Sequence, residues 1–420
     1  MEKQSAKGSS YAWAIAIACV AFYAVPLGFA ANHAGLFTTP LIDEFGWSQT
    51  ETTLYMSIQP WVAALCTPFA GKILSKCNPR IVMTLSVLVF ALAHLACAWF
   101  TAPWQWAVYG VLYGASASFW MYIATPTMVN RWFVKGNGTV IGVIGVTASL
   151  FGAIMSPLFG NIIAADGWRA ARIIQGIVVL IVGCGVSFAL LRESPKAMGV
   201  LPYGSGEQAD EAKVTKFDVA PDAGVMRAQA MKSPALWLLI IMAGLFVVSA
   251  SFIQQIARYA STVEGLASIG AFAVSVAMYA SIAGKFGLGW ICDRFGAKIA
   301  GLVAAVCLFC GPAVMLIAGE TAMIFLVGVA FFGFGFAALS IVPPMTCRQA
   351  FGNIDYANVF AVVATGLNIF SGFSALIYAT IYDVSGSYNG SFYMMMTFGI
   401  ILAVLSFVIV PVGRKLWVQG

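Results

Sequence analysis

Apolar runs long enough to cross a lipid bilayer recur along almost the whole chain. A membrane-spanning helix needs about 20 mostly apolar residues. Hydrophobic residues make up 61% of the 420 residues and charged residues only 9%, far more apolar surface than a soluble core can bury. We therefore predict an all-α membrane protein with twelve spans, over residues 12–39, 52–75, 81–100, 104–130, 139–163, 170–191, 235–257, 267–291, 298–318, 322–346, 357–381 and 391–412.

The positively charged residues predict the orientation of these spans. With both chain termini in the cytoplasm, all but four of the 22 lysines and arginines fall in cytoplasmic segments. The exceptions are Arg169, Arg172 and Arg258, assigned to the outer side, and Lys285, which lies within a span. Such an asymmetry is typical of multi-pass proteins of the plasma (bacterial inner) membrane. The net charge of +6 is therefore attributed to topology, and no nucleic-acid partner is expected.

A polar segment divides the chain into two halves. Residues 194–233 are rich in Gly, Pro and charged side chains, which is typical of a linker. The predicted domains are an N-terminal six-helix bundle at 1–193, a cytoplasmic linker at 194–233 and a C-terminal six-helix bundle at 234–420. Two pseudo-symmetric bundles of this kind, with a binding site near the membrane midplane, are a transporter architecture.

Two turns in corresponding places of the two halves resemble each other. The second predicted span is followed by GKILSKCNPR at 71–80 and the eighth by GWICDRFGAK at 289–298. Both begin with Gly, where helices pack closely, and both carry basic residues. We assign a gating role to these two turns and call them together the gating loop. Its residues are Gly71, Arg80, Gly289, Asp293, Arg294 and Gly296.

The second of these turns resembles the loop pattern G-x-x-x-D-R-x-G-x-K of the major facilitator superfamily. The first departs from it, with Ser75 in place of Asp and Asn78 in place of Gly. Further segments are similar to the oxalate–formate antiporter and monocarboxylate transporter branch of that superfamily. They are GLFTTPLIDEFGWSQTE at 35–51, NRWFVKGNGTVIGV at 130–143, GWRAARIIQG at 167–176 and RESPKAMGVLPYG at 192–204. The resemblance implies the major facilitator fold and a carrier of small carboxylates that works by alternating access.

Lys285 is the main candidate for binding a substrate. A lysine at the centre of a membrane helix costs about 2.5–3.5 kcal/mol on insertion scales, and the sixteen acidic residues are all expected in loops or at helix ends. One interpretation is that the side chain extends toward cytosolic water. The other is that it lines a cavity, because Ser275, Met278 and Ser281 share its helical face. The resemblance favours the second, since relatives carry a cation at this position that binds the substrate carboxylate.

Other polar or aromatic residues within spans are candidates for the same cavity, although each can equally be part of a packed core. The predicted substrate-binding residues besides Lys285 are Asn32, His33, Gln59, Trp120, Tyr122, Gln255 and Asn368. Dicarboxylate exchangers of the related branch also use a lysine in the eleventh span. The corresponding segment here, residues 362–372, has none, which argues against a dicarboxylate such as oxalate.

The sequence predicts a secondary transporter of small organic carboxylate anions, and anion exchange is the favoured mode. Residues 268–284 contain no Asp or Glu, where monocarboxylate relatives place a proton-binding carboxylate. A proton-coupled symporter remains the alternative, with His33 as the proton carrier. Export of an amphipathic compound is a further alternative, because 31 Phe and 12 Trp could line an apolar cavity.

Other classes of function find little support in the sequence. A sensor would need a sizeable soluble domain, and an enzyme would need a catalytic triad, a metal-ligand cluster or a phosphate-binding loop. We expect no enzymatic activity, no cofactor and no metal. The expected partners are a small organic carboxylate and the lipid bilayer, and the chain is expected to be a monomer.

Overall fold

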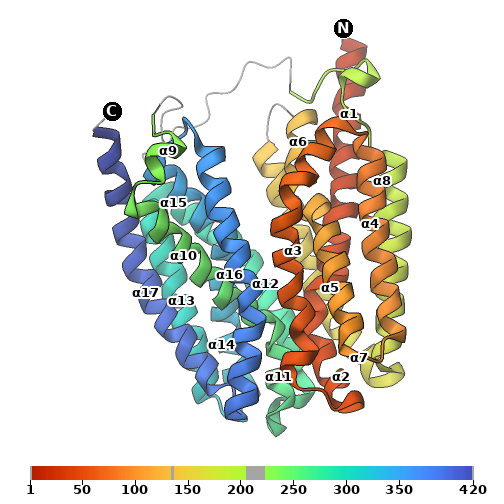
Figure 1. Ribbon diagram of the computed structural model, residues 1–420, viewed down its shortest axis with the longest axis vertical. Helices are drawn as coiled ribbons and strands as arrows, with labels where there is room; N and C mark the ends of the chain where they lie inside the picture. Colours follow the sequence, from red (N-terminus) through yellow and green to blue (C-terminus); the bar gives the residue numbers. More distant parts are fainter. Residues whose placement is uncertain (1, 134–136, 205–222, 419–420) are drawn as a thin grey trace. The chain divides into compact units, whose positions relative to one another are not determined.

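The computed structural model of the chain is built from helices (Figure 1). It describes residues 2–133, 137–204 and 223–418. Within these ranges the only extended pairings are two isolated bridges, Phe133 with Tyr203 and Gly224 with Gly352. The prediction of an all-α protein is therefore confirmed. The middle of the predicted linker, residues 205–222, lies outside the described residues.

The chain forms two compact units. The first contains residues 1–47 and 54–212, and the second contains residues 48–53 and 213–420. The short segment Ser48–Thr53 thus groups with the second unit, although it lies in the N-terminal part of the sequence. Each unit is described by itself below.

The helices of the first unit include several irregular stretches. Pro26 lies inside a π-helical segment, and a proline, which has no N–H group, breaks the regular hydrogen-bond pattern of an α-helix. The elements are α1 (Glu2–Cys19), η1 (Val20–Ala30), η2 (Ala31–Phe37), α2 (Thr38–Phe45), α3 (Gln49–Lys76), α4 (Pro79–Ala96), η3 (Cys97–Trp99), α5 (Pro103–Ala117), η4 (Ser118–Ala124), α6 (Thr125–Trp132), α7 (Asn137–Val178), η5 (Val179–Cys184), α8 (Gly185–Leu190) and η6 (Lys196–Met198).

The second unit contains the remaining helices. Within it α17 runs alongside α13 (Figure 1). Its elements are α9 (Arg227–Ala230), α10 (Pro234–Ala250), η7 (Ser251–Gln254), α11 (Ile256–Ser261), η8 (Glu264–Ile269), α12 (Gly270–Phe295), α13 (Ala297–Ile317), α14 (Ala322–Phe336), η9 (Ala337–Ser340), α15 (Val342–Phe351), α16 (Tyr356–Ser385), α17 (Asn389–Arg414) and η10 (Lys415–Val418).

The described helices account for the twelve predicted spans. Among the described residues, nine helical stretches are long and apolar enough to cross a membrane by length and composition. One of them, Thr139–Leu190, contains two predicted spans, because Gly167 at φ 82° breaks the helix. The two remaining predicted spans correspond to α3 and to the run from α5 through α6.

Local sequence explains where several helices begin and end. At the start of α4 the side chain of Asn78 accepts a hydrogen bond of 2.9 Å from the amide of Arg80, and Pro79 occupies the first helical turn. At the end of α12 the chain turns through Gly296 at φ 86°, a conformation that favours glycine. Asn78, at the corresponding place in the first turn, has φ −63°, which any residue can adopt. The second turn therefore needs a glycine where the first has Asn78.

The outer faces of the helices are apolar. Leu85 on α4, Phe286 on α12 and Val404 on α17 are 54%, 66% and 58% exposed. Such extensive exposed apolar surface fits contact with lipid rather than water. Inside the first unit the core is aromatic, with Trp106 and Trp120 fully buried.

Candidate functional site

Lys285 lies on the inward face of α12. The side chains on the opposite face, Phe286 and Trp290, are 66% and 57% exposed. At 100° per residue, Lys285 lies in the middle of a different face, which it shares with the buried residues Met278 and Ser281. Lys285 itself is half-buried and takes part in an interaction with its surroundings. Its direction is therefore away from the lipid-facing surface.

The polar residues next to Lys285 on this face are more enclosed than a cavity wall requires. Ser275 and Ser281 are 2% and 0% exposed. Their hydroxyls donate to carbonyls of the same helix, Ser281 to Met278 at 2.8 Å and Ser275 to Ala271 at 3.5 Å. The adjacent edge of α12 packs tightly on α14, since a Cβ on Gly284 would meet the backbone of Phe334. Lys285 is thus held on a closely packed helix.

Two further candidates lie in the second unit. Asn368 on α16 is 9% exposed, and its Oδ1 atom has no hydrogen-bond partner in the described part of the chain. Gln255, between η7 and α11, is 1% exposed. Its Oε1 atom accepts hydrogen bonds from Gln49 Nε2 at 2.8 Å and from the hydroxyl of Tyr388 at 3.2 Å. Gln255 is therefore already engaged by neighbouring side chains.

His33 lies in the 3₁₀ segment η2 beside Asn32, which is half-buried. The imidazole is 1% exposed. Its Nδ1 atom is 3.2 Å from the carbonyl oxygen of Phe29, and its Nε2 atom is 3.1 Å from that of Gly152. Carbonyl oxygens only accept hydrogen bonds, whereas a neutral imidazole has a single N–H group. Both contacts become hydrogen bonds only when the ring carries two protons.

The remaining first-unit candidates differ in their surroundings. Trp120 is fully buried in the core, where its ring stacks on Tyr113 at 6.2 Å. Gln59 on α3 is half-buried, and its Nε2 atom has no hydrogen-bond partner among the described residues. The backbone of Tyr122 belongs to η4, and its side chain lies outside the described residues.

The residues assigned to the gating loop lie at helix ends. Arg80 in the first turn of α4 donates a hydrogen bond of 2.5 Å from Nε to the backbone carbonyl of Phe188. The Arg80 guanidinium also lies 4.1 Å from the centre of the Phe188 ring. Asp293 and Arg294 are exposed in the last turn of α12. Gly71 is in α3 and Gly289 in α12, while Gly296 ends α12.

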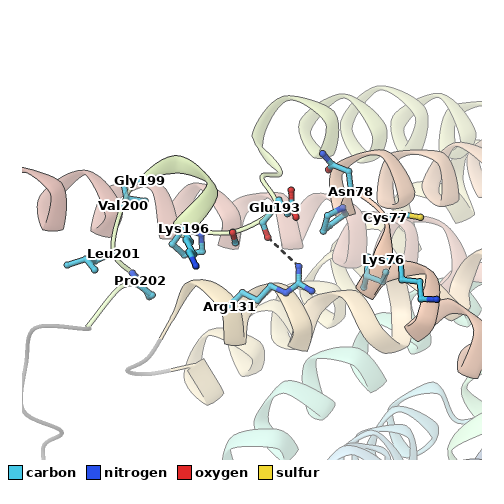
Figure 2. A pocket seen from close by; sticks show the side chains of 14 residues that line it. Lys76, Cys77, Asn78, Arg131, Glu193, Lys196, Gly199, Val200, Leu201 and Pro202 are labelled. Atoms are coloured by element: carbon cyan, nitrogen blue, oxygen red, sulfur yellow. Dashed lines mark hydrogen bonds between the residues drawn. The ribbon is translucent and has the colours of Figure 1, made fainter.

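A cavity of about 970 Å³ lies in the first unit, at the turn between α3 and α4. Its basic lining residues are Lys76, Arg131 and Lys196. Figure 2 shows Arg131 directed toward Glu193, whose backbone carbonyl accepts a hydrogen bond from Nη1 at 3.4 Å. None of the predicted substrate-binding residues lines this cavity, so it is separate from the predicted substrate site.

The burial of Arg172 was not predicted from the sequence. Arg172, assigned to the outer side of the membrane, is 1% exposed within the helices of the first unit. Arg172 is therefore a second basic residue enclosed by helices, besides Lys285. The signal was available, because the predicted span 170–191 already includes position 172. His94, another fully buried residue, lies next to this arginine, with Arg172 Nη1 3.1 Å from His94 Nε2.

Comparison with known proteins identifies the family. The model of the Major Facilitator Superfamily matches residues 15–353, well over half of the chain. The chain therefore belongs to this superfamily, and it is a membrane transporter rather than an enzyme. The nucleoside transporter NupG has the same fold, with a TM-score of 0.71 over 96% of this chain and 99% of that one, at 10% identity.

Two curated relatives show how far the similarity extends. Monocarboxylate transporter 14 of Homo sapiens is 28% identical over 177 residues, which are 41% of this chain and 33% of that protein. The probable hexose phosphate transport protein of Chlamydia pneumoniae is 21% identical over 302 residues, 65% of this chain and 64% of that protein. The chain thus matches about a third of the length of the first relative and just under two thirds of the second.

Proposed function

We propose that the chain is a secondary active transporter of small organic monocarboxylates that works by alternating access as an anion exchanger. The observation that carries the proposal is Lys285, a cation on the inward face of α12, opposite the apolar face of that helix. A lysine held inside a membrane protein attracts an anionic ligand and marks a substrate pathway. Asn368 and Asn32 could orient the ligand through hydrogen bonds.

The charge of a monocarboxylate matches a site with one cation better than the charges of the substrates named for the relatives, which are sugar phosphates and nucleosides. A sugar phosphate carries between one and two negative charges at neutral pH and is best held by more than one cation. Helix α16, where dicarboxylate carriers of the related branch place a second cation, contains no Lys or Arg. A nucleoside carries no charge for Lys285 to bind. The partial similarity to a human monocarboxylate transporter also supports a monocarboxylate as the substrate. It supports an assignment of the chain to the oxalate–formate antiporter and monocarboxylate transporter branch.

Competition in proteoliposomes tests the substrate class. Purified protein would be reconstituted, and uptake of a labelled monocarboxylate measured against an excess of unlabelled monocarboxylates, dicarboxylates, hexose phosphate, glycerol 3-phosphate or nucleoside. We expect monocarboxylates to reduce uptake by at least tenfold and the other compounds to have little effect. Competition by the phosphate esters alone would overturn the proposal and favour an organophosphate carrier.

The contacts of His33 favour a second candidate function, a proton-coupled monocarboxylate symporter. Both ring nitrogens face carbonyl oxygens, at 3.2 Å and 3.1 Å, which could each accept a hydrogen bond from a doubly protonated ring, whereas burial of the imidazole opposes its positive charge. A side chain that gains and loses a proton during the transport cycle could carry the proton that accompanies the anion. This candidate shares the substrate and Lys285 with the exchanger and differs only in coupling.

The predicted orientation can be tested by cysteine labelling from outside the cell. In a background without native cysteines, Thr101→Cys, in the turn between α4 and α5, is expected to react with a membrane-impermeant maleimide. Ala197→Cys, at the start of the predicted cytoplasmic linker, is expected to react only after the membrane is permeabilised. Both positions are exposed, so accessibility does not limit either reaction. Labelling of Ala197→Cys in intact cells would reverse the topology.

A further inference from the structure

The guanidinium of Arg172 is enclosed by side chains of the first unit. It lies on α7, five residues after the break at Gly167, and is 1% exposed. The ring of Phe37 lies 3.7 Å from Cζ and the ring of Trp106 lies 5.4 Å from it. The Nη1 atom is 3.1 Å from His94 Nε2. One end of the guanidinium therefore has a polar partner, and its faces contact aromatic rings.

The other edge of the guanidinium has no carboxylate partner among the described residues. Neither Nε nor Nη2 of Arg172 makes a hydrogen bond in the described part of the chain. These two N–H groups point in the same direction and form the fork with which arginine binds an anion at two points. No hydrogen bond or ion pair between described residues joins Arg172 to a carboxylate. Arg169, three residues earlier, is paired at 2.7 Å with Glu44, so that carboxylate is already occupied.

Several hydrogen-bond donors around Arg172 have no acceptor among the described residues. The indole Nε1 of Trp106 is buried without a partner among the described residues. The hydroxyl of Tyr55 faces Arg172, from which its oxygen can accept a hydrogen bond, while its own O–H has no acceptor among the described residues. His94 Nε2 also lies 2.9 Å from Gln175 Oε1, and a single ring nitrogen cannot accept from Arg172 and donate to Gln175 at once. Whether His94 Nε2 carries the imidazole proton or not, the Nε and Nη2 groups of Arg172 remain without an acceptor among the described residues.

A small anion would satisfy both the donors and the charge. A buried charge without a counter-charge is strongly destabilising. A water molecule could accept the N–H groups of the fork, but it would leave the charge of Arg172 uncompensated. An anion can accept hydrogen bonds from several N–H and O–H groups at once and cancels the charge. The unsatisfied N–H and O–H groups and the aromatic rings of Phe37 and Trp106 around Arg172 favour a compact monovalent ion.

We propose that Arg172, Trp106 and Tyr55 form a binding site for a small monovalent anion, either a halide or the carboxylate of a one- or two-carbon acid. The anion binds at the Nε and Nη2 edge of Arg172 and joins α3, α5 and α7. Its role is to stabilise the first unit. The site is separate from Lys285, which belongs to the second unit, and does not depend on the proposed substrate.

Thermal unfolding in different salts tests this site. Purified protein would be heated at fixed pH and ionic strength in chloride, formate or gluconate, the last being too large for an enclosed site. Because a ligand that binds the folded state raises the unfolding temperature, we expect chloride or formate to raise Tm by several degrees over gluconate. A larger shift in one of the two identifies a halide or a carboxylate. Equal Tm in all three salts would overturn the proposal.

Matched variants assign the effect to Arg172 and its neighbours. Trp106→Phe removes one indole N–H and keeps an aromatic ring, so we expect it to fold and to lose most of the salt-dependent shift. Trp132→Phe is the control, because Trp132 Nε1 is also buried without a partner among the described residues, beside Tyr11. It should keep the full shift, as should Lys285→Gln, which excludes binding at the proposed substrate site. A full shift in Trp106→Phe would contradict the assignment.

Discussion

Replacing Lys285 by glutamine is expected to reduce transport by at least a hundredfold while leaving expression and membrane insertion unchanged. Glutamine has a similar length and can still donate hydrogen bonds, but it cannot supply the charge that binds a carboxylate. The position supports this expectation, because Lys285 lies on the inward face of a helix whose other side is 49–66% exposed at Tyr279 and Phe286. The measurement is initial uptake of labelled monocarboxylate into proteoliposomes.

Arginine at the same position should retain part of the activity. It keeps the positive charge, but its wide planar fork needs more room than an ammonium group. Lys196→Gln is the control, since Lys196 is an exposed lysine in η6, and it should transport normally. If correctly inserted Lys285→Gln also transports normally, Lys285 is not the substrate cation, and extension of its side chain toward water becomes the better account.

The fold could be predicted from sequence because the bilayer imposes its length on every span. Windows of about 20 apolar residues locate the helices well, and the polar segment near residue 200 separates six predicted spans from six. The irregular stretches were not predicted. Pro26 marks the break in the first span, but the π-helical segment η1 and the 3₁₀ segment η2 that follow depend on how the neighbouring helices pack.

The candidate site was harder to predict, because the surroundings of a polar residue depend on tertiary contacts. Lys285 stands out in an apolar run, and its face follows from helical periodicity. The contacts of His94 with Tyr109, Gln175 and Arg172 come from residues 15 to 81 positions away, so no local sequence pattern predicts them. Arg169 and Arg172 have nearly the same sequence context. One forms an ion pair with Glu44 and the other is buried, a difference that only the packed structure reveals.

Preloading the vesicles with unlabelled substrate is expected to have a large effect on uptake, because it separates anion exchange from proton-coupled symport. The sixteen acidic residues are predicted in loops or at helix ends, so proton transfer through a buried carboxylate is not expected. If Lys285 must be occupied by an anion before the protein can change between its inward-open and outward-open states, the protein is an exchanger. Labelled substrate should then enter vesicles at least tenfold faster when they are preloaded with unlabelled monocarboxylate, and a proton gradient should make little difference.

Proton-coupled symport predicts the opposite result in the same experiment, and His33 makes the comparison decisive. A symporter would fill empty vesicles when the outside is acidic, because the inward proton gradient drives the anion with it. Uptake would fall when an ionophore collapses that gradient. In His33→Ala the ring that faces the carbonyls of Phe29 and Gly152 is absent, so proton-driven uptake should be lost, while counterflow between preloaded vesicles should survive because Lys285 still binds the anion. Gradient-driven uptake that persists in His33→Ala would reject both the exchanger and the role of His33, and would place the proton on another group.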